Sequence, residues 1–335
     1  DSDPAACGKA CRMKALYCRA NAEDIDTLKI EDVTLSPVGP DQVRVRVRAA
    51  SVNFPDILMV QGKYQHRPEL PFVVGGEFAG DIVETGSAVT QFKKGGRVVG
   101  GGFSGAFAEE NIVNAASVRP IPDGVDYATA ASFTTAYLTA YVSLVRRGEL
   151  AKGETLLVHG AAGGVGLAAV DLGKVLGATV IATASSDEKR TFLKDYGADH
   201  VLPSSGFRDA VKELTGGRGA DVIYDPVGGD VFDESVRCIA FNGRILIVGF
   251  TSGRIPSISV NMPLIKGFSV VGVRAGEYGR KFPEKGRENI EAIDALLAEK
   301  KIRPHIHARF SLFQALEAMH MLTTRKVIGK VVIEP

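Results

Sequence analysis

The sequence predicts an α/β protein of two domains, one rich in β-strands and one built on a doubly wound parallel sheet. The chain has 335 residues, more than a single hydrophobic core usually organises. Its first third consists of short β-branched segments separated by Gly and Pro, whereas beyond about residue 126 strand-like and helical segments alternate. Such alternation is typical of βαβ units, which place helices on both faces of a parallel sheet.

The domain boundaries follow from this change of pattern. We expect the β-rich domain to comprise residues 13–135 and 276–335, and the parallel-sheet domain to comprise residues 136–275. Residues 43–48 alternate valine with arginine, as in a strand with one buried face and one solvated basic face. Residues 1–12 lack an apolar segment and precede Met13, so we interpret them as a leader or a cloning remnant.

The second domain is predicted element by element from apolar periodicity and from Gly and Pro breaks. The expected elements are a helix over 128–145, a strand over 155–159, a helix from 164, a strand over 179–184, a helix over 188–196, a strand over 200–202, a helix over 207–215, and strands over 222–224 and 244–248. Two further helices, over 287–300 and 310–323, and a closing strand over 331–334 lack the βαβ rhythm and are expected to return to the first domain.

Composition excludes several classes of protein. Forty Lys and Arg against 39 Asp and Glu give a net charge of +1, which supplies no general attraction to nucleic acid. Gly, Pro or charged residues interrupt every apolar stretch, so no membrane span is expected. The four cysteines, at positions 7, 11, 18 and 238, are expected to be free thiols of a reducing compartment. We expect a cytoplasmic protein, or a mitochondrial matrix protein if residues 1–12 are a processed leader.

A glycine-rich turn at Ala161–Gly166 carries the most specific signal. The apolar strand over 155–159 runs into this turn, which passes directly into a helix, and a second strand follows. In a Rossmann domain this context brings backbone N–H groups to a pyrophosphate, here from Gly163, Gly164 and Val165. A plain tight turn is the alternative, and the order of strand, turn, helix and strand disfavours it.

The end of the second strand indicates which dinucleotide binds. NAD-binding domains place an acidic residue there, against the ribose 2′-hydroxyl. This chain has Ser185 at that point, and the cations Lys189 and Arg190 follow. The sequence therefore predicts NADPH, with Asp187 as the residue that would favour NAD instead.

The sequence resembles the medium-chain dehydrogenase/reductase superfamily, and within it the zinc-free quinone oxidoreductases related to zeta-crystallin. The resemblance implies a GroES-like β-rich catalytic domain and a Rossmann domain, and it covers the chain from Met13 onward. The motifs that carry it are Ser51–Asp56, Gly62–Tyr64, Leu70–Phe72, Gly75–Gly80, Leu138–Tyr141, the glycine turn, Asp225–Gly229 and Gly329–Val332.

In zinc-dependent relatives a Cys and a His hold the catalytic metal, and this chain has Asn53 and Gly76 at those positions. The four-cysteine lobe that binds a structural zinc is also missing between residues 95 and 109. No metal is therefore expected, and an acceptor that needs little activation fits best. The implied activity is hydride transfer from NADPH to a quinone or a conjugated carbonyl compound.

The resemblance also implies site residues. Asn53 and Tyr64 are the candidate catalytic residues. Asn53 and Thr139 match positions near the nicotinamide, and Gly249, Phe250 and Val273 match positions of backbone contact to it. The positions implied around the 2′-phosphate are Ser185, Lys189, Arg325 and Ser204, the last of which stands where the branch often has a phosphate-contacting Tyr.

For Tyr64 and His159 the sequence allows a structural as well as a functional interpretation. Tyr64 matches a tyrosine of the substrate cleft that would polarise an oxygen or deliver a proton, and its alternative is a rim aromatic packing a loop. Leu58 replaces a Tyr common in the branch, which reshapes the substrate pocket. His159, at the end of a strand, is expected to be a buried, hydrogen-bonded residue rather than a proton shuttle.

Two other functions remain open. An enoyl-thioester or alkenal reductase needs the same cofactor site with a longer acceptor channel. A non-catalytic NADPH-binding protein, structural or nucleic-acid-binding, is the alternative from another class. The family commonly forms homodimers through sheet edges, and the apolar segment over 268–273 is the candidate edge.

Overall fold

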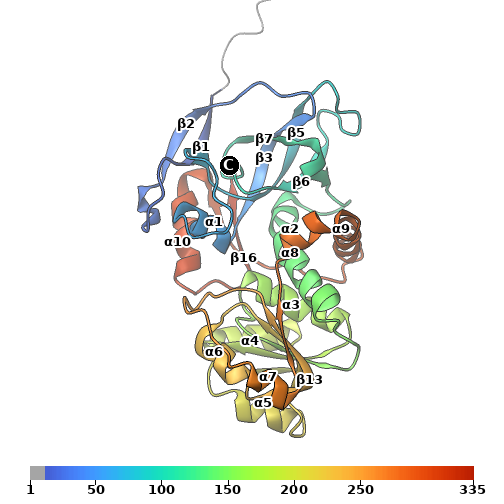
Figure 1. The fold of residues 1–335 in the computed structure, drawn as a ribbon. Coiled ribbons are helices and arrows are strands. Elements are labelled where there is room, and N and C mark those ends of the chain that lie inside the picture. Colours follow the sequence, from blue (N-terminus) through green and yellow to red (C-terminus); the bar gives the residue numbers. More distant parts are fainter. Residues whose placement is uncertain (1–11) are drawn as a thin grey trace, which may run out of the picture. The chain divides into compact units, whose positions relative to one another are not determined.

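The computed structural model describes residues 12–335, and its contacts divide the chain into two units (Figure 1). Unit 1 contains residues up to 133 and residues 305–335, and unit 2 contains residues 134–304. The predicted leader lies outside the described residues apart from Arg12, as do Cys7 and Cys11. Cys18 and Cys238 are buried free thiols. Within residues 12–335, no helix is long and apolar enough to span a membrane.

Unit 1 is built mainly on antiparallel β-structure, with β15 and β16 paired in parallel, which confirms the β-rich domain. One sheet has the order β15-β16-β3-β5-β6-β8 with β7 also paired to β3, and a smaller sheet has the order β2-β1-β4. The strands are β1 (Arg12–Cys18), β2 (Lys29–Thr34), β3 (Gln42–Val52), β4 (Phe72–Val73), β5 (Glu77–Thr85), β6 (Arg97–Gly101), β7 (Glu110–Asn114), β8 (Val118–Pro120), β15 (Ile306–Ser311) and β16 (Lys330–Glu334).

Strand β3 shows the alternation that the sequence predicted. Val43, Val45 and Val47 are buried in the core of unit 1. The arginines between them pair with carboxylates of neighbouring strands, as Arg44 does with Glu84 at 2.8 Å. The valine face therefore holds the sheet on its core, and the arginine face is solvated and ion-paired.

The C-terminal segment of the chain belongs to unit 1. Strand β16 pairs antiparallel with β3, with Val331 opposite Val52 and Ile333 opposite Ala50. The helices of unit 1 are α1 (Phe54–Val60) and α10 (Ala315–Thr323), with short 3-10 turns η2 (Ile25–Thr27), η3 (Ala115–Ser117) and η5 (Leu312–Gln314). Side chains from both ends of the described chain, such as Leu16 and Ile333, therefore share the core of unit 1.

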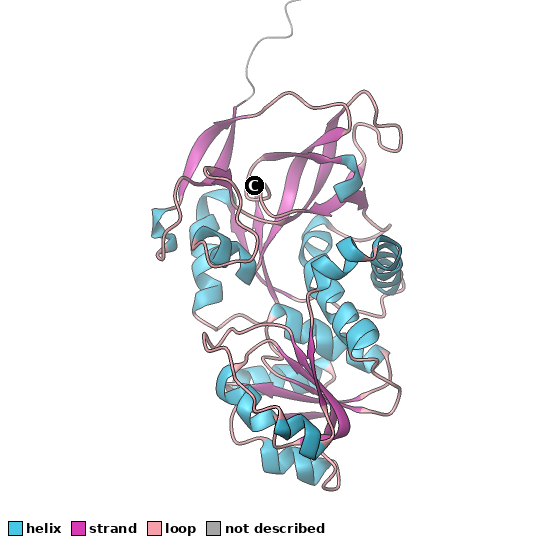
Figure 2. Cartoon of the chain, viewed as in Figure 1, coloured by secondary structure: helices cyan, strands magenta, loops and turns pink. Residues whose placement is uncertain are grey.

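Unit 2 is built on a six-stranded parallel sheet of order β11-β10-β9-β12-β13-β14, flanked by helices (Figure 2). The strands are β9 (Thr155–Val158), β10 (Thr179–Ala184), β11 (His200–Pro203), β12 (Ala220–Asp225), β13 (Ile239–Ile247) and β14 (Ser269–Gly272). The chain runs outward from β9 to β11 and returns to β12 on the other side of β9. The order thus reverses beside β9, at the position where doubly wound sheets bind ligands.

The helices of unit 2 include those that the sequence predicted, together with α6, α7 and α8, which it did not predict. They are α2 (Tyr127–Tyr141), which begins in unit 1, the π-helical turn η4 (Val142–Arg147), α3 (Gly164–Val175), α4 (Asp187–Tyr196), α5 (Arg208–Leu214), α6 (Gly229–Ser235), α7 (Asn261–Lys266), α8 (Ala275–Lys281) and α9 (Pro283–Ala298). Arg146 ties α9 to η4 by donating to the Oδ1 of Asn289 at 2.8 Å. The division by contacts keeps α8 and α9 in unit 2, whereas the sequence placed the return to the first domain at residue 276.

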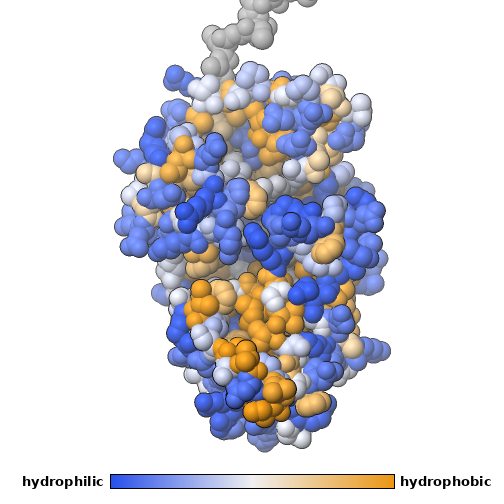
Figure 3. Space-filling view, in the orientation of Figure 1, coloured by the Kyte–Doolittle hydropathy of each residue, from blue (hydrophilic) through white to orange (hydrophobic). Residues whose placement is uncertain are grey.

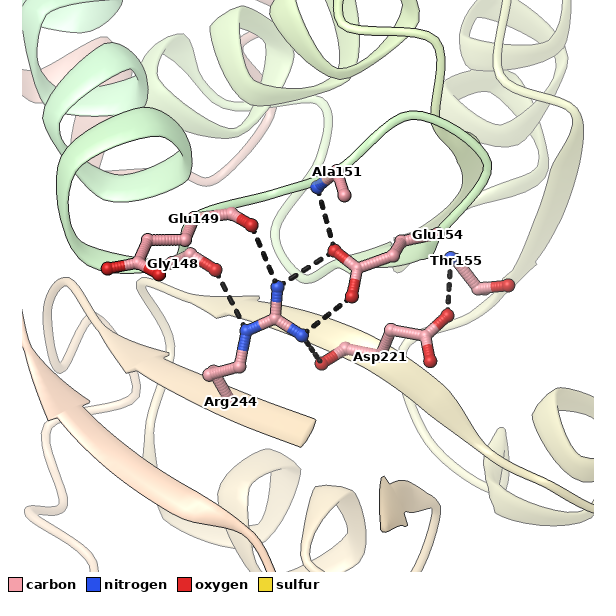
Figure 4. A network of polar contacts seen from close by, with 7 residues as sticks. All are labelled: Gly148, Glu149, Ala151, Glu154, Thr155, Asp221 and Arg244. Carbon is pink, nitrogen blue, oxygen red and sulfur yellow. Dashed lines mark hydrogen bonds and ion pairs between the residues drawn. The ribbon is translucent and has the colours of Figure 1, made fainter. Parts of the chain in front are cut away.

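A polar network around Arg244 fastens the amino edge of this sheet (Figure 4). Its guanidinium donates to both carboxylate oxygens of Glu154 at 2.8 Å and to the carbonyl of Gly148 at 2.8 Å. Asp221, at the start of β12, accepts from the backbone N–H of Thr155 in β9 at 2.8 Å. A forked guanidinium–carboxylate pair has defined geometry, so the network holds β13 to the starts of β9 and β12 at this edge.

Candidate functional site

The carboxyl edge of the parallel sheet gathers most of the residues that the sequence proposed for the cofactor. They follow the ends of five strands, and parallel strands end at one edge of the sheet. Gly163, Gly164 and Val165 follow β9, Ser185 follows β10, Ser204 follows β11, Gly249 and Phe250 follow β13, and Val273 follows β14. Thr139 lies in α2, where its hydroxyl donates to the carbonyl of Thr135 at 2.7 Å.

The glycine turn is shaped by close backbone packing. Gly160 has φ +55°, in the left-handed region that favours glycine. A Cβ on Gly166 would lie 2.3 Å from the carbonyl oxygen of Gly160, so the first turn of α3 requires glycine there. Helix α3 begins at Gly164, and its first N–H groups have no acceptor within the helix. This geometry fits a pyrophosphate at the helix N-terminus.

The segment after β10 determines the charge beside an adenosine ribose. Ser186 caps α4, with its Oγ accepting from the N–H of Lys189 at 3.3 Å. Arg190 donates to the carbonyl of Ala184, the last residue of β10, at 3.0 Å, and it also pairs with Asp187. The side chain of Asp187 is 97% exposed. The one acid that would favour NAD is therefore neutralised by a neighbouring guanidinium and turned to solvent.

Asp225, at the end of β12, was seen in the sequence only as part of a motif. Its Oδ1 accepts from the N–H groups of Val227 and Gly228 at 2.8 and 2.9 Å. Burial raises the pKa of this carboxyl, and the two N–H groups partly offset that rise. Its role is to shape the turn that adjoins the glycine loop, where the side chain of Val227 would lie 3.2 Å from a Cβ on Gly160.

The second group of site residues lies in unit 1, around the N-terminus of α1. Asn53 precedes α1, and its backbone N–H donates to the Oδ2 of Asp56 at 2.7 Å. Its side-chain Nδ2 donates to the Oε2 of Glu77 at 3.1 Å, and its Oδ1 accepts from the Nζ of Lys330 at 2.6 Å. Asp56, Glu77 and Lys330 are buried, whereas Asn53 is partly exposed. We name these four residues the Asn53 cluster.

Burial dominates the electrostatics of the Asn53 cluster. Desolvation raises the pKa of Asp56 to about 7, although the N–H of Asn53 and the charge of Lys330 lower it. Desolvation also lowers the pKa of Lys330, and the charges of Glu77 and Asp56 oppose that change. The sequence had assigned Asn53 to the site without its three buried partners. The only signal for these was their position in the Ser51–Asp56, Gly75–Gly80 and Gly329–Val332 motifs.

Tyr64 and Arg325 also lie in unit 1. Tyr64 is partly buried and packs against the core of unit 1. Among residues 12–335 its hydroxyl has no hydrogen-bond partner, so the packing role and the proton-delivery role are compatible. Arg325 is exposed in the turn after α10 and has a left-handed backbone with φ +57°. The functional roles of these two residues stay predictions.

His159 is the buried, hydrogen-bonded histidine that the sequence predicted. It is fully buried, and its two ring nitrogens contact the hydroxyls of Thr183 at 3.0 Å and Ser235 at 2.8 Å. Burial lowers its pKa to about 3. The imidazole is therefore neutral at physiological pH and is held on both sides, so it is part of the core of unit 2.

Two domain families and several relatives match this chain. The alcohol dehydrogenase GroES-like domain matches residues 39–123, and the zinc-binding dehydrogenase domain matches residues 164–294. Quinone oxidoreductase-like protein 2 homolog from Nematostella vectensis is 43% identical over 91% of this chain and 85% of its own length. Quinone oxidoreductase-like protein 2 from Bos taurus is 41% identical over 98% of this chain and 93% of its own length.

A solved structure shares the arrangement of the fold. The quinone oxidoreductase of Escherichia coli, solved as a complex with NADPH, is 28% identical to this chain. The two align with a TM-score of 0.86 over 97% of this chain and 99% of the other.

Zinc, which one of the matching family descriptions names, does not fit the Asn53 cluster. The ammonium of Lys330 lies 2.6 Å from the Oδ1 of Asn53 and 3.8 Å from the Oε2 of Glu77, so the available oxygen ligands already face a cation. A Cβ on Gly76 would lie 2.9 Å from the carbonyl oxygen of Gly102. A histidine therefore has no room at this position, and no step of the chemistry is assigned to a metal.

Proposed function

Because the chain belongs to the zinc-free quinone oxidoreductase branch of the medium-chain dehydrogenase/reductase superfamily, we propose that it is an NADPH-dependent reductase of quinones or conjugated carbonyl compounds. The observation that carries this proposal is the glycine turn at the carboxyl edge of the sheet, next to a strand end without an unpaired acid. The NADPH complex of the Escherichia coli relative supports the choice of cofactor.

The residues of unit 2 would bind the cofactor. The N–H groups of Gly163, Gly164 and Val165, at the start of α3, are proposed for the pyrophosphate. Ser185, Lys189 and Ser204 of unit 2 are proposed for the 2′-phosphate, and Arg325 of unit 1 stays a candidate from the resemblance alone. Lys189 is partly buried, and its pKa is lowered chiefly by desolvation, which an anionic phosphate would offset. Thr139, Gly249, Phe250 and Val273 are proposed for the nicotinamide end.

The chemistry that NADPH supplies when bound is transfer of a hydride, which with one proton reduces a quinone to a hydroquinone. Asn53 is proposed to orient the reacting groups, and Tyr64 to donate the proton to the acceptor oxygen, with solvent returning it. Neither step needs a Lewis acid, since a quinone accepts hydride without one.

Steady-state oxidation of NADPH with a panel of quinones, enones and alkenals tests the proposal. We expect turnover with quinones and much weaker turnover with NADH. Product analysis separates the alternatives: a saturated carbon–carbon bond identifies an alkene reductase. Tight binding of NADPH without turnover of any acceptor would contradict an enzymatic role and favour a non-catalytic NADPH-binding protein.

We also propose that two copies pair through unit 2. Strand β14 is the last strand of the parallel sheet, so one of its edges has no neighbour within the sheet. Large apolar side chains on and beside α7 are exposed, with Phe241 81%, Val260 86%, Leu264 82% and Ile265 71% accessible. Apolar side chains gather on the visible face of unit 2 (Figure 3). A second copy would cover these side chains and extend the sheet edge to edge.

A further inference from the structure

The side-chain amide of Asn53 has little freedom in this structure. Its Nδ2 carries two hydrogens, and these face the Oε2 of Glu77 at 3.1 Å and the carbonyl of Ser51 at 3.2 Å. Its Oδ1 faces the Nζ of Lys330 at 2.6 Å. Because an ammonium can only donate, the oxygen and not the nitrogen of the amide must point to Lys330. The orientation of the amide is therefore set by the chemistry of Lys330.

The fold holds Lys330 itself in place. It opens β16, one position before Val331, which lies opposite Val52 in the antiparallel register. Its backbone N–H donates to the carbonyl of His305 at 2.9 Å. Gly329 has φ +78°, and a Cβ there would lie 2.3 Å from that same carbonyl oxygen. The glycine therefore permits the tight approach that brings the lysine beside Asn53.

Burying the ionisable side chains of the Asn53 cluster costs free energy, so packing of the core alone does not explain their presence. A buried ammonium and buried carboxyls lose hydration, and that loss is offset only when the groups face one another in good geometry. Lys330 is 7% exposed, Glu77 2% and Asp56 1%. Each of the three contacts Asn53 or its backbone, and Asn53 is the one member that is partly exposed. The three buried ionisable residues thus all contact Asn53, whose side chain is accessible to a ligand.

We propose that Lys330 is a positioning residue for the reaction, which fixes the amide of Asn53 so that it meets the bound cofactor or acceptor only as a hydrogen-bond acceptor, through the remaining lone pair of Oδ1. This inference rests on the proposed function, because it assigns Asn53 to the site where hydride is transferred. It predicts that Asn53 does not donate a hydrogen bond to a ligand, since both hydrogens of Nδ2 are already engaged.

Kinetics of four proteins test this proposal: the unchanged chain, Lys330→Met, Asn53→Ala and the double variant. Turnover of NADPH with a quinone should fall by about 10- to 100-fold in kcat for Lys330→Met, with a smaller change in KM, because positioning acts on the transition state. In the Asn53→Ala background the same lysine substitution should change kcat by less than about twofold, since its target is gone. Lys330→Arg keeps a donor-only cation and should recover part of the activity.

Two further variants distinguish a loss of positioning from a loss of folding. Lys330→Met leaves two buried carboxyls without a cation, so Lys330→Met with Glu77→Gln supplies a charge-balanced variant in which Asn53 still finds an acceptor oxygen. Lys174→Met is the matched control, because it removes a lysine that pairs with Asp199 in unit 2 at 2.6 Å and should leave turnover unchanged. Equal fold-losses from Lys330→Met in the presence and absence of Asn53 would overturn the positioning role.

A measurement without turnover separates this inference from the proposed function. The side-chain NH₂ resonances of Asn53, identified by their loss in Asn53→Ala, should shift and exchange faster with solvent in Lys330→Met. If the unchanged chain oxidises no NADPH with any acceptor yet these resonances change as expected, the proposed function fails and the fixing of the amide stands. Unchanged resonances in Lys330→Met would overturn the inference whatever the activity.

Discussion

At the scale of single residues, electrostatic context distinguishes what the sequence could predict from what it could not. The sequence proposed Asn53 and Ser185 as site residues from their positions. It also predicted His159 as a core residue, and the structure confirms this by the full burial of His159. It could not find Glu77 or Lys330 as partners of Asn53. These residues are 24 and 277 positions away from it, and only the pairing of β16 and β3 brings the lysine close.

The choice between NADPH and NADH should depend on the pair of Arg190 and Asp187. Arg190→Gln frees the carboxylate of Asp187 beside the proposed 2′-phosphate position, and we expect the preference for NADPH, measured as the ratio of Kd values, to fall about fivefold, the size of a screened charge–charge interaction near the surface. Fluorescence titration of the two cofactors measures this ratio. Asp187→Asn in the Arg190→Gln background should restore it, and an unchanged ratio in Arg190→Gln would contradict the assignment.

His159 should make the protein sensitive to acid. Its pKa is lowered in the folded state from 6.5 to about 3, so the unfolded chain binds the proton more readily. The stability due to the neutral imidazole is complete above the unfolded pKa and is lost as pH falls toward about 3, by about 1.4 kcal/mol per pH unit. Urea unfolding between about pH 6 and about pH 4 should show a shallower loss for His159→Gln than for the unchanged protein. Parallel curves would refute the prediction.

At the scale of elements, the strands were predicted more accurately than the connections. The strand over 179–184 matches β10 without adjustment, because its apolar residues are continuous and its boundaries are sharp. The helix expected over 128–145 instead changes at Val142 to a π-helical turn, which periodicity does not reveal. Helices α6 and α7 were not predicted, since each is short and carries little apolar periodicity.

The glycine turn offers a prediction at this scale. Gly166→Ala places a methyl group against the backbone of Gly160 and forces the start of α3 away from β9. We expect NADPH affinity to fall at least about tenfold, with a loss of roughly 1–3 kcal/mol in the free energy of unfolding, as for overpacked interiors. Gly102→Ala is the matched control, because its nearest atom would lie at 3.9 Å. Full NADPH affinity in Gly166→Ala would show that the cofactor does not use this turn.

At the scale of the whole molecule, two units were expected from chain length and pattern, and two are found. The difference lies in α8 and α9, which the sequence assigned to the first domain because they lack the βαβ rhythm. Arg146 of η4 contacts Glu288 and Asn289 of α9, and the division by contacts keeps both helices in unit 2. Such a contact joins residues more than 140 positions apart, and a single sequence does not show it.

Pairing of two copies is the prediction for the assembled protein. Leu264→Glu places a charge in the exposed apolar surface of α7, where a partner would have to bury it. We expect light scattering after size-exclusion chromatography to give a dimer for the unchanged chain and a monomer for Leu264→Glu. Leu214→Glu, at another exposed leucine of unit 2, is the control that should remain dimeric. A monomeric unchanged chain at micromolar concentration would contradict the proposed pairing.

The central claim, reduction of an acceptor by NADPH without a metal, is tested most directly by a single turnover. The protein is dialysed against a chelator, loaded with NADPH and mixed rapidly with a simple benzoquinone, and the nicotinamide absorbance is followed. We expect the absorbance to decay to that of the oxidised form at the same rate before and after chelation, and loading with NADH to give a much slower decay. An absorbance that stays constant after chelation and decays only when zinc is restored would contradict it.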